Sequence, residues 1–359
     1  MKYRVLAINP GSTSTKISVF DADIEVFIKT LRHDPAELDR VGPIMEQDQY
    51  RKQLVLEAMK ENNVDPKSLD AVVGRGGMVH PVHGGTFRIN DKMLADLKDP
   101  SFWGRVHASN LGPHIAKSIA DELNIPSFIV DPVAVDEFDD IARISGIPEI
   151  TRKSLLHALN IRYTARVLAK KINKDFDKCN MIAAHLGGGF SVVAIKQGQM
   201  VDANNALLGM GPFSPQRAGA LPIGDIIEMA YSGKYTKKEL QTYLSKNAGL
   251  TAYLGTDDGK LICDRIEAGD LEAKKYFDAM IYQIAKDMAA CAAVVYGKVD
   301  AIFITGGLAY GKYLVDELTK RIEFIAPVHI FPGEYEMEAL SQGAVNVLKG
   351  IEEAYEYNP

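Results

Sequence analysis

Short apolar runs alternate with amphipathic stretches along the whole chain, and this alternation predicts an α/β protein. Apolar runs that end at glycine or polar turns predict buried strands at 5–8, 17–20, 71–73, 127–130, 181–185, 192–195, 301–305 and 328–331. Apolar residues at helical spacing predict helices at 51–62, 113–123, 154–172, 236–245, 271–296 and 340–349. Thr236 and Glu239 have the spacing of a capping box, which marks a helix start.

The first pair of predicted strands encloses a polar turn, NPGSTSTK, at residues 9–16. Four hydroxyls and one ammonium surround Gly11, and the turn contains no acidic side chain. Because glycine lets the backbone approach a ligand closely, such a turn is typical of a phosphate site. It is not a Walker P-loop, since GxxxxGK[ST] is absent and a strand follows. Taken alone, an ordinary polar hairpin loop explains the turn equally well.

A second hairpin, MIAAHLGGGFSVVAIK at 181–196, repeats the first one. Asn9 aligns with His185 at an offset of 176 residues, about half of the 359-residue chain. This offset predicts a duplicated fold, because solenoid repeats are much shorter. We expect the two hairpins to hold a polyphosphate from two sides. A third turn, Gly306–Gly307, lies between a strand and a helical pattern that begins at Leu308, and it predicts either a nucleotide contact or only a tight connection.

Size and composition narrow the classes of protein. A chain of 359 residues accommodates two domains. No long linker stands out, so we expect a short crossing near 150–154, with one domain at 1–153 plus 343–359 and the other at 154–342. The net charge of −6 disfavours nucleic-acid binding. Three scattered cysteines without a CxxC pair fit a reducing cytoplasm. The apolar runs are too short for a membrane span, and Pro10-Gly11 follows the N-terminus too closely for the apolar region of a signal peptide.

Charged and polar residues follow the predicted strands and glycine turns, where α/β proteins bind ligands. Arg75 follows the strand at 71–73, and Asp131 follows the strand at 127–130. His185 ends a strand, His157 lies in the predicted helix 154–172, and Arg217 lies in the loop GPFSPQRAGALP. Each has an ordinary alternative, a surface ion pair for arginine or a packing role for histidine. His80 and His83 have metal-like spacing, but without a third ligand we favour a loop that lines the ligand cleft.

These motifs resemble those of the acetate and butyrate kinase family, in the superfamily of sugar kinases, heat-shock chaperone ATPase domains and actin. N-x-G-S-x-S-x-K at 9–16 resembles the family's first motif, HLGGG at 185–189 its second phosphate loop, and FITGG at 303–307 its adenosine motif. The matches run in the family's order from residue 5 to about residue 343. GRGG…HPVHGGT and PGEYEMEALSQGA resemble the butyrate kinases more than the acetate kinases, which usually carry Asn where Gly188 stands.

The resemblance implies duplicated ribonuclease H-like (actin-like ATPase) domains with an interdomain active-site cleft. It implies reversible, ATP-dependent phosphorylation of butanoate to butanoyl phosphate by direct in-line transfer, with Mg²⁺ as cofactor and ATP or ADP as co-substrate. We expect a cytoplasmic homo-oligomer, dimeric or higher, without nucleic-acid or membrane partners. A preference for isobutyrate or another branched acid, propionate or acetate stays open. A nucleotide-driven switch ATPase is a weaker alternative, since no residues are left for a peptide-binding module.

The resemblance also implies roles for single residues. Arg75 would bind the substrate carboxylate, His157 and His185 would contact the transferring phosphoryl group, and Arg217 would stabilise transition-state charge. Asp131 matches the family's active-site aspartate, and Ile161 replaces a second histidine. The residues implied for nucleotide and phosphate binding are Asn9, Gly11, Ser12, Ser14, Lys16, Gly187, Gly188, Gly189, Gly306 and Gly307. Asn9 and Glu336 are implied for magnesium, with Glu334 and Glu338 as alternatives to Glu336.

A carboxylic acid is almost fully ionised at neutral pH, so it attacks phosphorus without a general base. What it needs are cations and donors that offset its repulsion from the phosphates, and the proposed set supplies them. A sugar kinase would instead need Asp131 as a base. For the acyl chain, Leu156 replaces a phenylalanine of the acetate members, and Gly76 and Gly77 replace larger apolar residues. With Arg75, Leu156 and Gly77 in the substrate site, we expect a graded preference for butyrate or isobutyrate over acetate.

Overall fold

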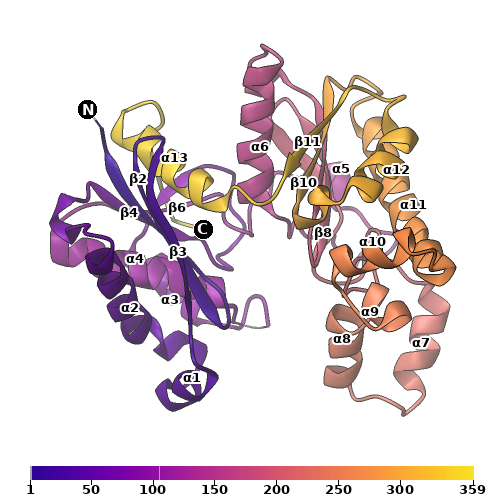
Figure 1. The fold of residues 1–359 in the computed structure, drawn as a ribbon, viewed down its shortest axis with the longest axis horizontal. Helices are drawn as coiled ribbons and strands as arrows, with labels where there is room; N and C mark the ends of the chain where they lie inside the picture. The colour runs from indigo at the N-terminus through magenta and orange to yellow at the C-terminus, as the bar shows by residue number, and fades with distance from the viewer. Residues whose placement is uncertain (1, 105) are drawn as a thin grey trace. The chain divides into compact units, whose positions relative to one another are not determined.

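The computed structural model describes residues 2–104 and 106–359, and it divides into two compact units (Figure 1). The first unit runs from the N-terminus to Val135 and includes Tyr335–Pro359, and the second is Asp136–Glu334. These bounds differ from the predicted domain boundaries, which lie between residues 153 and 154 and between residues 342 and 343. Residues 136–153 pack with the second unit through the Arg152–Asp202 ion pair at 2.6 Å. Helix α13 (Glu336–Leu348) packs on strands of the first unit.

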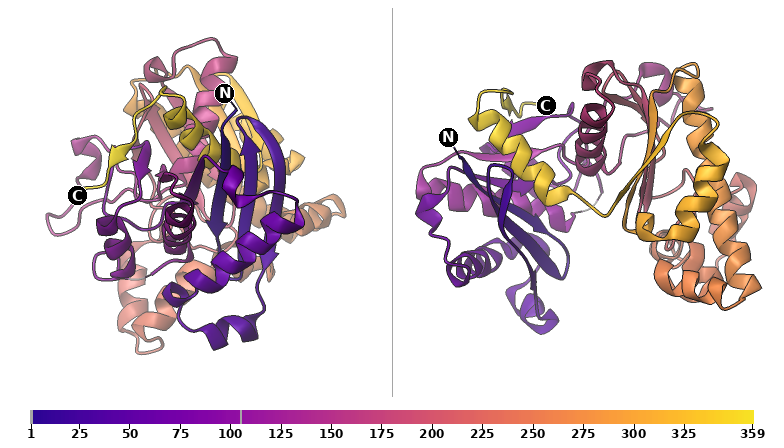
Figure 2. Two further views of the ribbon diagram at one scale, coloured as in Figure 1. Left: turned by 90° about the vertical axis from the view of Figure 1, so that its left-hand side faces the viewer. Right: turned by 45° about the horizontal axis from the view of Figure 1, so that its top comes forward.

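The first unit is built on a seven-stranded mixed sheet, ordered β12-β5-β6-β4-β1-β2-β3. Its strands are β1 (Arg4–Pro10), β2 (Ser14–Asp21), β3 (Ile24–Arg32), β4 (Ala71–Arg75), β5 (Thr86–Arg88), β6 (Ser127–Val130) and β12 (Tyr355–Glu356). Besides α13, its helices are α1 (Pro35–Val41), α2 (Asp48–Glu61), α3 (Asp91–Lys98) and α4 (Leu111–Leu123). Successive residues of β6 face opposite sides. Ile129 joins the core beneath α4, and Val130 lies against Gly343 of α13, so the two helices cover opposite faces (Figure 2).

The second unit is built on a five-stranded sheet, ordered β11-β10-β7-β8-β9. Its strands are β7 (Met181–Leu186), β8 (Phe190–Lys196), β9 (Gln199–Ala203), β10 (Ala301–Gly306) and β11 (Val328–Pro332). Its helices are α5 (Asp140–Arg143), α6 (Ala158–Lys171), α7 (Ile223–Tyr231), α8 (Lys237–Lys246), α9 (Gly249–Leu254), α10 (Gly259–Glu267), α11 (Leu271–Val294) and α12 (Lys312–Ile322). Figure 1 shows α6 on one side of this sheet and α11 on the other.

The two sheets share one strand plan. In the first unit β3, β2 and β1 form an antiparallel meander, and β4 and β6 continue in parallel with β1. In the second unit β9, β8 and β7 form the same meander, and β10 and β11 continue in parallel. The predicted duplication at half the chain length is therefore confirmed. Each unit has its own apolar core, which fits two separately packed domains.

Most predicted elements are present, and the differences lie at their ends. The strand predicted at 127–130 has those bounds, and the capping box at Thr236 is formed. The prediction that His157 lies within a helix was wrong. Helix α6 begins at Ala158, and His157 is the residue that precedes it, with ψ of 59°. After β10 the chain forms a 3₁₀ turn at Gly307–Tyr310 before α12 begins at Lys312.

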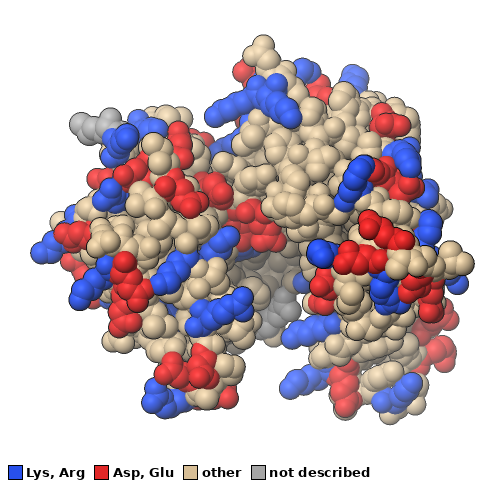
Figure 3. Space-filling model, viewed as in Figure 1, with Lys and Arg blue, Asp and Glu red and all other residues tan. Residues whose placement is uncertain are grey.

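Acidic and basic side chains are interspersed on both units over the face drawn in Figure 3. On that face the described residues form no continuous basic surface of the kind that tracks a nucleic-acid backbone. Within residues 2–104 and 106–359, no helix combines the length and the apolar character needed to cross a bilayer.

Candidate active site

The first glycine turn connects two antiparallel strands of the first unit. Asn9 of β1 lies opposite Lys16 of β2, and the Gly11 N–H donates to the Ser14 carbonyl at 2.7 Å. Ser12 and Thr13 are exposed at its tip. The Lys16 ammonium has no hydrogen-bond or ion-pair partner among the described residues. The turn therefore exposes Ser12 and Thr13, whereas the Thr15 hydroxyl is buried against His33 and Arg51.

Glu336 connects two of the predicted site residues in the first unit. Its Oε2 accepts a hydrogen bond from Asn9 Nδ2 at 2.6 Å, and its Oε1 forms an ion pair with Arg75. The side chain is 8 % exposed and begins α13, where the helix N-terminus favours a carboxylate. Of the three glutamates that the sequence leaves open, Glu336 bonds Asn9. Glu334 belongs to the second unit, where its Oε1 lies 3.7 Å from His185 Nε2.

Asp131 directly follows β6 and is 5 % exposed. Its Oδ1 accepts from the Gly85 N–H at 2.8 Å, and its own N–H donates to the Gly85 carbonyl at 3.0 Å. Its φ of +38° is unusual for a non-glycine residue, and such conformations cluster at functional sites. The β4–β6 register sets Val130 opposite Arg75, so Asp131 leaves the sheet at the same edge as Arg75.

The glycines after Arg75 have a packing role that the sequence does not reveal. A Cβ on Gly76 would lie 2.6 Å from Cβ of Pro132, and a Cβ on Gly77 would collide with Asn110. The space in these directions is filled by the first unit itself. The absence of side chains at Gly76 and Gly77 therefore does not leave room for an acyl chain in those directions, and the size argument rests on Leu156 alone.

The two predicted histidines meet in the second unit. The rings of His157 and His185 stack with centroids 4.0 Å apart and planes 13° apart. His157 Nδ1 lies 2.8 Å from Ser191 Oγ on β8, and His185 Nδ1 lies 2.7 Å from Asn160 Nδ2 on α6. Asn160 is fully buried, its Nδ2 also lies 3.2 Å from Thr305 Oγ1, and its Oδ1 accepts from Thr164. The pair is thus oriented from both sides.

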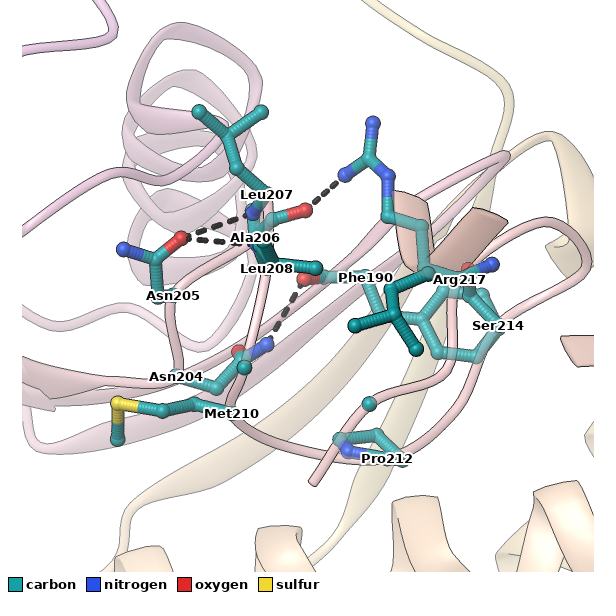
Figure 4. Close-up of a pocket in the computed structure, with 13 residues that line it drawn as sticks. Phe190, Asn204, Asn205, Ala206, Leu207, Leu208, Met210, Pro212, Ser214 and Arg217 are labelled. Carbon is teal, nitrogen blue, oxygen red and sulfur yellow. Dashed lines mark hydrogen bonds between the residues drawn. The ribbon is translucent and has the colours of Figure 1, made fainter. Parts of the chain in front are cut away.

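Arg217 lies against the second glycine turn. The Ser214 hydroxyl of its loop donates to the Gly188 carbonyl at 2.8 Å, and the Arg217 guanidinium occupies the space beside Gly189 where a side chain would stand. Figure 4 shows Arg217 hydrogen-bonded to the Ala206 carbonyl, at the edge of a pocket that Phe190 and Leu208 also line. Glycine at 189 is therefore needed to seat the guanidinium. A Cβ on Gly187 would lie 3.6 Å from His185 Nε2, and one on Gly188 would lie 3.9 Å from Gln216 Oε1, both ordinary contact distances.

The third glycine turn closes the end of β10. Gly306 has φ of +93°, and a Cβ there would collide with the backbone of Leu186. Its N–H and carbonyl pair with Gly333 at 3.0 Å each. Gly307 has nothing within 4 Å of the position of a Cβ. Gly306 thus has a packing requirement, whereas Gly307 leaves open space beside the strand end. Leu156, just before His157, is 3 % exposed.

The electrostatics of the first turn include a cation that the sequence prediction missed. Arg51 of α2 is fully buried, and its guanidinium donates to backbone carbonyls of the turn. Burial lowers its pKa to about 10. Burial, together with the charge of Arg51, lowers the pKa of neighbouring His33 to about 4. A sequence signal for Arg51 exists, since it shares a helical face with Val55 and Met59, and a charge on an apolar face indicates a buried role.

The structure thus brings Asn9, Arg75 and Glu336 together in the first unit, and His157 and His185 together in the second. Asn160 and Ser191 orient the histidines and are absent from the predicted set, because their types are common and only tertiary contacts identify them. Among the described residues, no three His, Cys, Asp or Glu side chains converge on a metal-sized site.

Comparisons with known proteins identify the family and the fold of this chain. Residues 149–326 match the model of the acetokinase family. The chain is 52% identical to a "Probable butyrate kinase" of Clostridium botulinum, covering 99% of this chain and 100% of that protein. It is 49% identical to "Butyrate kinase 2" of Clostridium acetobutylicum, with the same coverage. The crystal structure of Porphyromonas gingivalis acetate kinase has the same fold, with a TM-score of 0.78, 18% identity, and 98% and 100% of the two chains covered. The chain therefore belongs to the acetate and butyrate kinase family, with the duplicated actin-like fold.

Proposed function

We propose that this chain is a butyrate kinase, which transfers the terminal phosphoryl group of ATP to butanoate. A carboxylate oxygen forms a bond to the γ-phosphorus while the bond from that phosphorus to the β,γ-bridging oxygen breaks. The products are butanoyl phosphate and ADP, and the reaction is reversible. The observation that carries the proposal is the full-length similarity to butyrate kinases at about half of all positions. The charged groups of both units support it.

The substrate needs a cation and no base. Butanoate is ionised at neutral pH, so the obstacle is repulsion between its charge and the phosphates. Arg75 is the proposed carboxylate-binding residue. Its ion pair with Glu336 supports this role, because the guanidinium is placed to donate hydrogen bonds to a carboxylate. In this proposal Asp131 shapes the loop through Gly85 and does not remove a proton from the substrate.

The second unit supplies donors for the transferring group. Asn160 Nδ2 donates to His185 Nδ1, which leaves the His185 proton on Nε2. That N–H, the His157 ring and the Arg217 guanidinium are proposed to stabilise charge on the phosphoryl oxygens in the transition state. The glycine turns at 187–189 and 306–307, and the turn at 9–16, are proposed to hold the nucleotide phosphates and the nucleoside through backbone N–H groups, hydroxyls and Lys16.

Magnesium fits the donor set of the first unit. Asn9 and Glu336 offer an amide and a carboxylate within 2.6 Å of each other, and Mg²⁺ commonly binds one or two carboxylates with water and substrate phosphates. These two residues would hold the ion, directly or through water, since a carboxylate keeps acceptor sites beyond those used by Asn9 and Arg75. The ion would supply neutralisation of phosphate charge.

The same proposal includes a cytoplasmic homo-oligomer. Helix α7 exposes Ile223, Ile227 and Tyr231, with exposed fractions of 76%, 50% and 89%, and it buries no residue in this chain. An apolar helix side of this kind supports a subunit contact.

The test is a hydroxamate assay of acyl phosphate over straight and branched acids of two to six carbons, with ADP release measured in parallel. We expect ADP release that depends on the acid, with the highest kcat/KM for butyrate or isobutyrate. Replacing Arg217 with alanine should lower kcat by about 10²–10³, the scale for losing one transition-state donor. Replacing Arg265, which forms an ion pair with Asp270 on the same unit, is the matched control. ADP release that ignores the acid would favour a switch ATPase, and equal or better kinetics with acetate would contradict the acyl preference.

A further inference from the structure

The proposed phosphate turn at 9–16 rests on a buried arginine. Arg51 is 0% exposed, and its guanidinium donates to the carbonyls of Gly11 at 2.7 Å, Ser12 at 3.0 Å and Ser14 at 3.2 Å. Its remaining hydrogen bonds go to Thr15 Oγ1 at 3.1 Å and to Gln47 Oε1 at 2.8 and 3.2 Å. Within residues 2–104 and 106–359, none of its donors meets a carboxylate.

The contacts of Arg51 with the turn carbonyls also fix the direction of the backbone N–H groups of the turn. In a trans peptide the N–H of one residue points opposite to the carbonyl of the residue before it. Because the Gly11 and Ser12 carbonyls point toward Arg51, the N–H groups of Ser12 and Thr13 point away from it. Both residues are exposed, and neither N–H has a partner in the described part of the chain. Successive free N–H groups that point the same way form an anion-binding concavity.

The same residue adds a fixed charge behind the turn. The lowered pKa of Arg51, about 10, is still well above neutral pH, so the guanidinium is charged when the protein works. A buried charge without a carboxylate partner is costly unless it is fully hydrogen-bonded. Here the acceptors are mostly backbone carbonyls of the turn itself. An apolar side chain of similar size would leave these carbonyls without their donor.

We propose that Arg51 is a positioning residue for the phosphates of ATP: it fixes the turn so that the Ser12 and Thr13 N–H groups face the ligand. The inference rests on the proposed function for the identity of that ligand. Arg51 itself touches no reacting atom. Its guanidinium fork, and not its charge alone, is required, because three carbonyls are held at once.

Lys52 provides a matched control, because it is the next residue of α2 and is 6% exposed. Its ammonium bonds Glu122 at 2.6 Å and Ser118 Oγ at 2.8 Å, both on α4 and away from the turn. The variants R51M, R51K and K52M would be compared by thermal unfolding, hydrogen exchange over residues 11–15, calorimetric binding of Mg-ADP, and steady-state kinetics. R51K keeps the positive charge, so it can test the role of Arg51 if R51M does not fold.

We expect both methionine variants to lower Tm, but only the Arg51 variants to change the turn. R51M should lower kcat/KM for ATP on the order of 10²-fold, the cost of a small misplacement of a bound group, and should leave KM for butyrate within about twofold. R51K should recover only part of the loss. Exchange over 11–15 should quicken in R51M and R51K and not in K52M.

The proposed role of Arg51 would be wrong if R51K and R51M matched K52M in nucleotide kinetics, Mg-ADP binding and hydrogen exchange. The two proposals fail separately. If the wild-type chain phosphorylates no carboxylic acid but its Mg-ADP affinity falls in R51M and R51K, the proposed function fails and the role of Arg51 stands. If the wild-type chain phosphorylates butyrate and the Arg51 variants behave as K52M, the proposed function stands and the proposed role of Arg51 fails.

Discussion

The imidazole rings of His157 and His185 stack with centroids 4.0 Å apart and planes 13° apart. Two imidazolium rings stacked at this distance would repel each other. Asn160 favours a neutral His185. Its Oδ1 accepts from Thr164, so its NH₂ group faces His185 Nδ1, and an NH₂ group cannot accept a proton from that ring. His185 therefore keeps one proton, on Nε2.

Replacing Asn160 with leucine should lower kcat by about two- to tenfold, the worth of one hydrogen bond that orients a ring. The pH–rate profile should also gain an acidic limb, because His185 Nδ1 becomes free to take a proton. Replacing Thr164 with valine removes a hydrogen bond from the same network, but the Asn160 NH₂ group keeps its bond to Thr305 Oγ1, which holds the amide toward His185. The profile of this variant should therefore keep the wild-type shape. A leucine variant with the wild-type pH profile would show that Asn160 does not set the protonation of His185.

The contrast between these residues explains what sequence can predict here. The two hairpins were predictable because apolar runs, glycine turns and a repeat offset are local signals. His185 and Arg75 were predictable because they end strands. His157 was placed inside a helix because apolar periodicity continues through it, while its bond to Ser191 Oγ on β8 sets it just before the helix. Asn160 and Arg51 act through tertiary contacts that periodicity does not encode. The requirement for glycine at 77 comes from its contact with Asn110, which only the folded structure reveals.

The ion pair between Arg75 and Glu336 predicts coupled effects on substrate binding and stability. Replacing Arg75 with alanine should raise KM for butyrate by about 10- to 100-fold, the worth of a charged hydrogen-bonded contact, with a smaller effect on kcat. It should also destabilise the protein by about 3 kcal/mol, because Glu336 stays buried with its bond to Asn9 but without its cationic partner. In a Glu336→Gln background the stability cost should shrink, which a double-mutant cycle by chemical unfolding would measure. Independent, additive costs would argue against the pairing.

Magnesium dependence distinguishes the three glutamates near the start of α13. Glu336→Gln should raise the magnesium concentration for half-maximal activity, because a neutral amide is a weaker ligand for a hard cation than a carboxylate. Glu338→Gln and Glu334→Gln should leave it within about twofold, since Glu336 is the glutamate that bonds Asn9 and Glu334 lies beside His185. Titration of activity with magnesium at fixed ATP, together with calorimetry of magnesium in the presence of ADP, would measure this. A larger shift in either control would move the site to that residue.

Acid stability should depend on His33 beside the first turn. Its ring is buried against Thr15 Oγ1 at 2.8 Å, near Tyr50 and Arg51, and its pKa falls to about 4 because of burial first and the Arg51 charge second. The unfolded chain binds the proton near pH 6.5, so protonation favours unfolding, and stability is lost as pH falls from about 6.5 toward 4. The loss attributable to His33 is at most about 3 kcal/mol.

In His33→Asn this contribution disappears, so the difference in unfolding free energy between wild type and variant should narrow as pH falls through that range. Exposed His83 offers a control, since His83→Asn should parallel the wild type. Urea unfolding at half-unit pH steps would measure both. A constant difference between wild type and His33→Asn across the range would refute the prediction.

Acyl selectivity should respond to Leu156 and not to the glycines after Arg75. Phenylalanine is larger than Leu156, which directly precedes His157, so Leu156→Phe should lower kcat/KM for butyrate more than for acetate. Butyrate has two methylenes more than acetate, each worth about 0.8 kcal/mol when buried. The ratio of kcat/KM for butyrate to kcat/KM for acetate should therefore fall by about 15-fold. Gly77→Ala should instead lower Tm, because its new methyl group meets Asn110, and should leave the ratio nearly unchanged in the folded fraction. Kinetics with acetate, propionate and butyrate on both variants, scaled to active enzyme, would decide. A ratio that shifts in Gly77→Ala and not in Leu156→Phe would place the acyl chain beside the Arg75 loop.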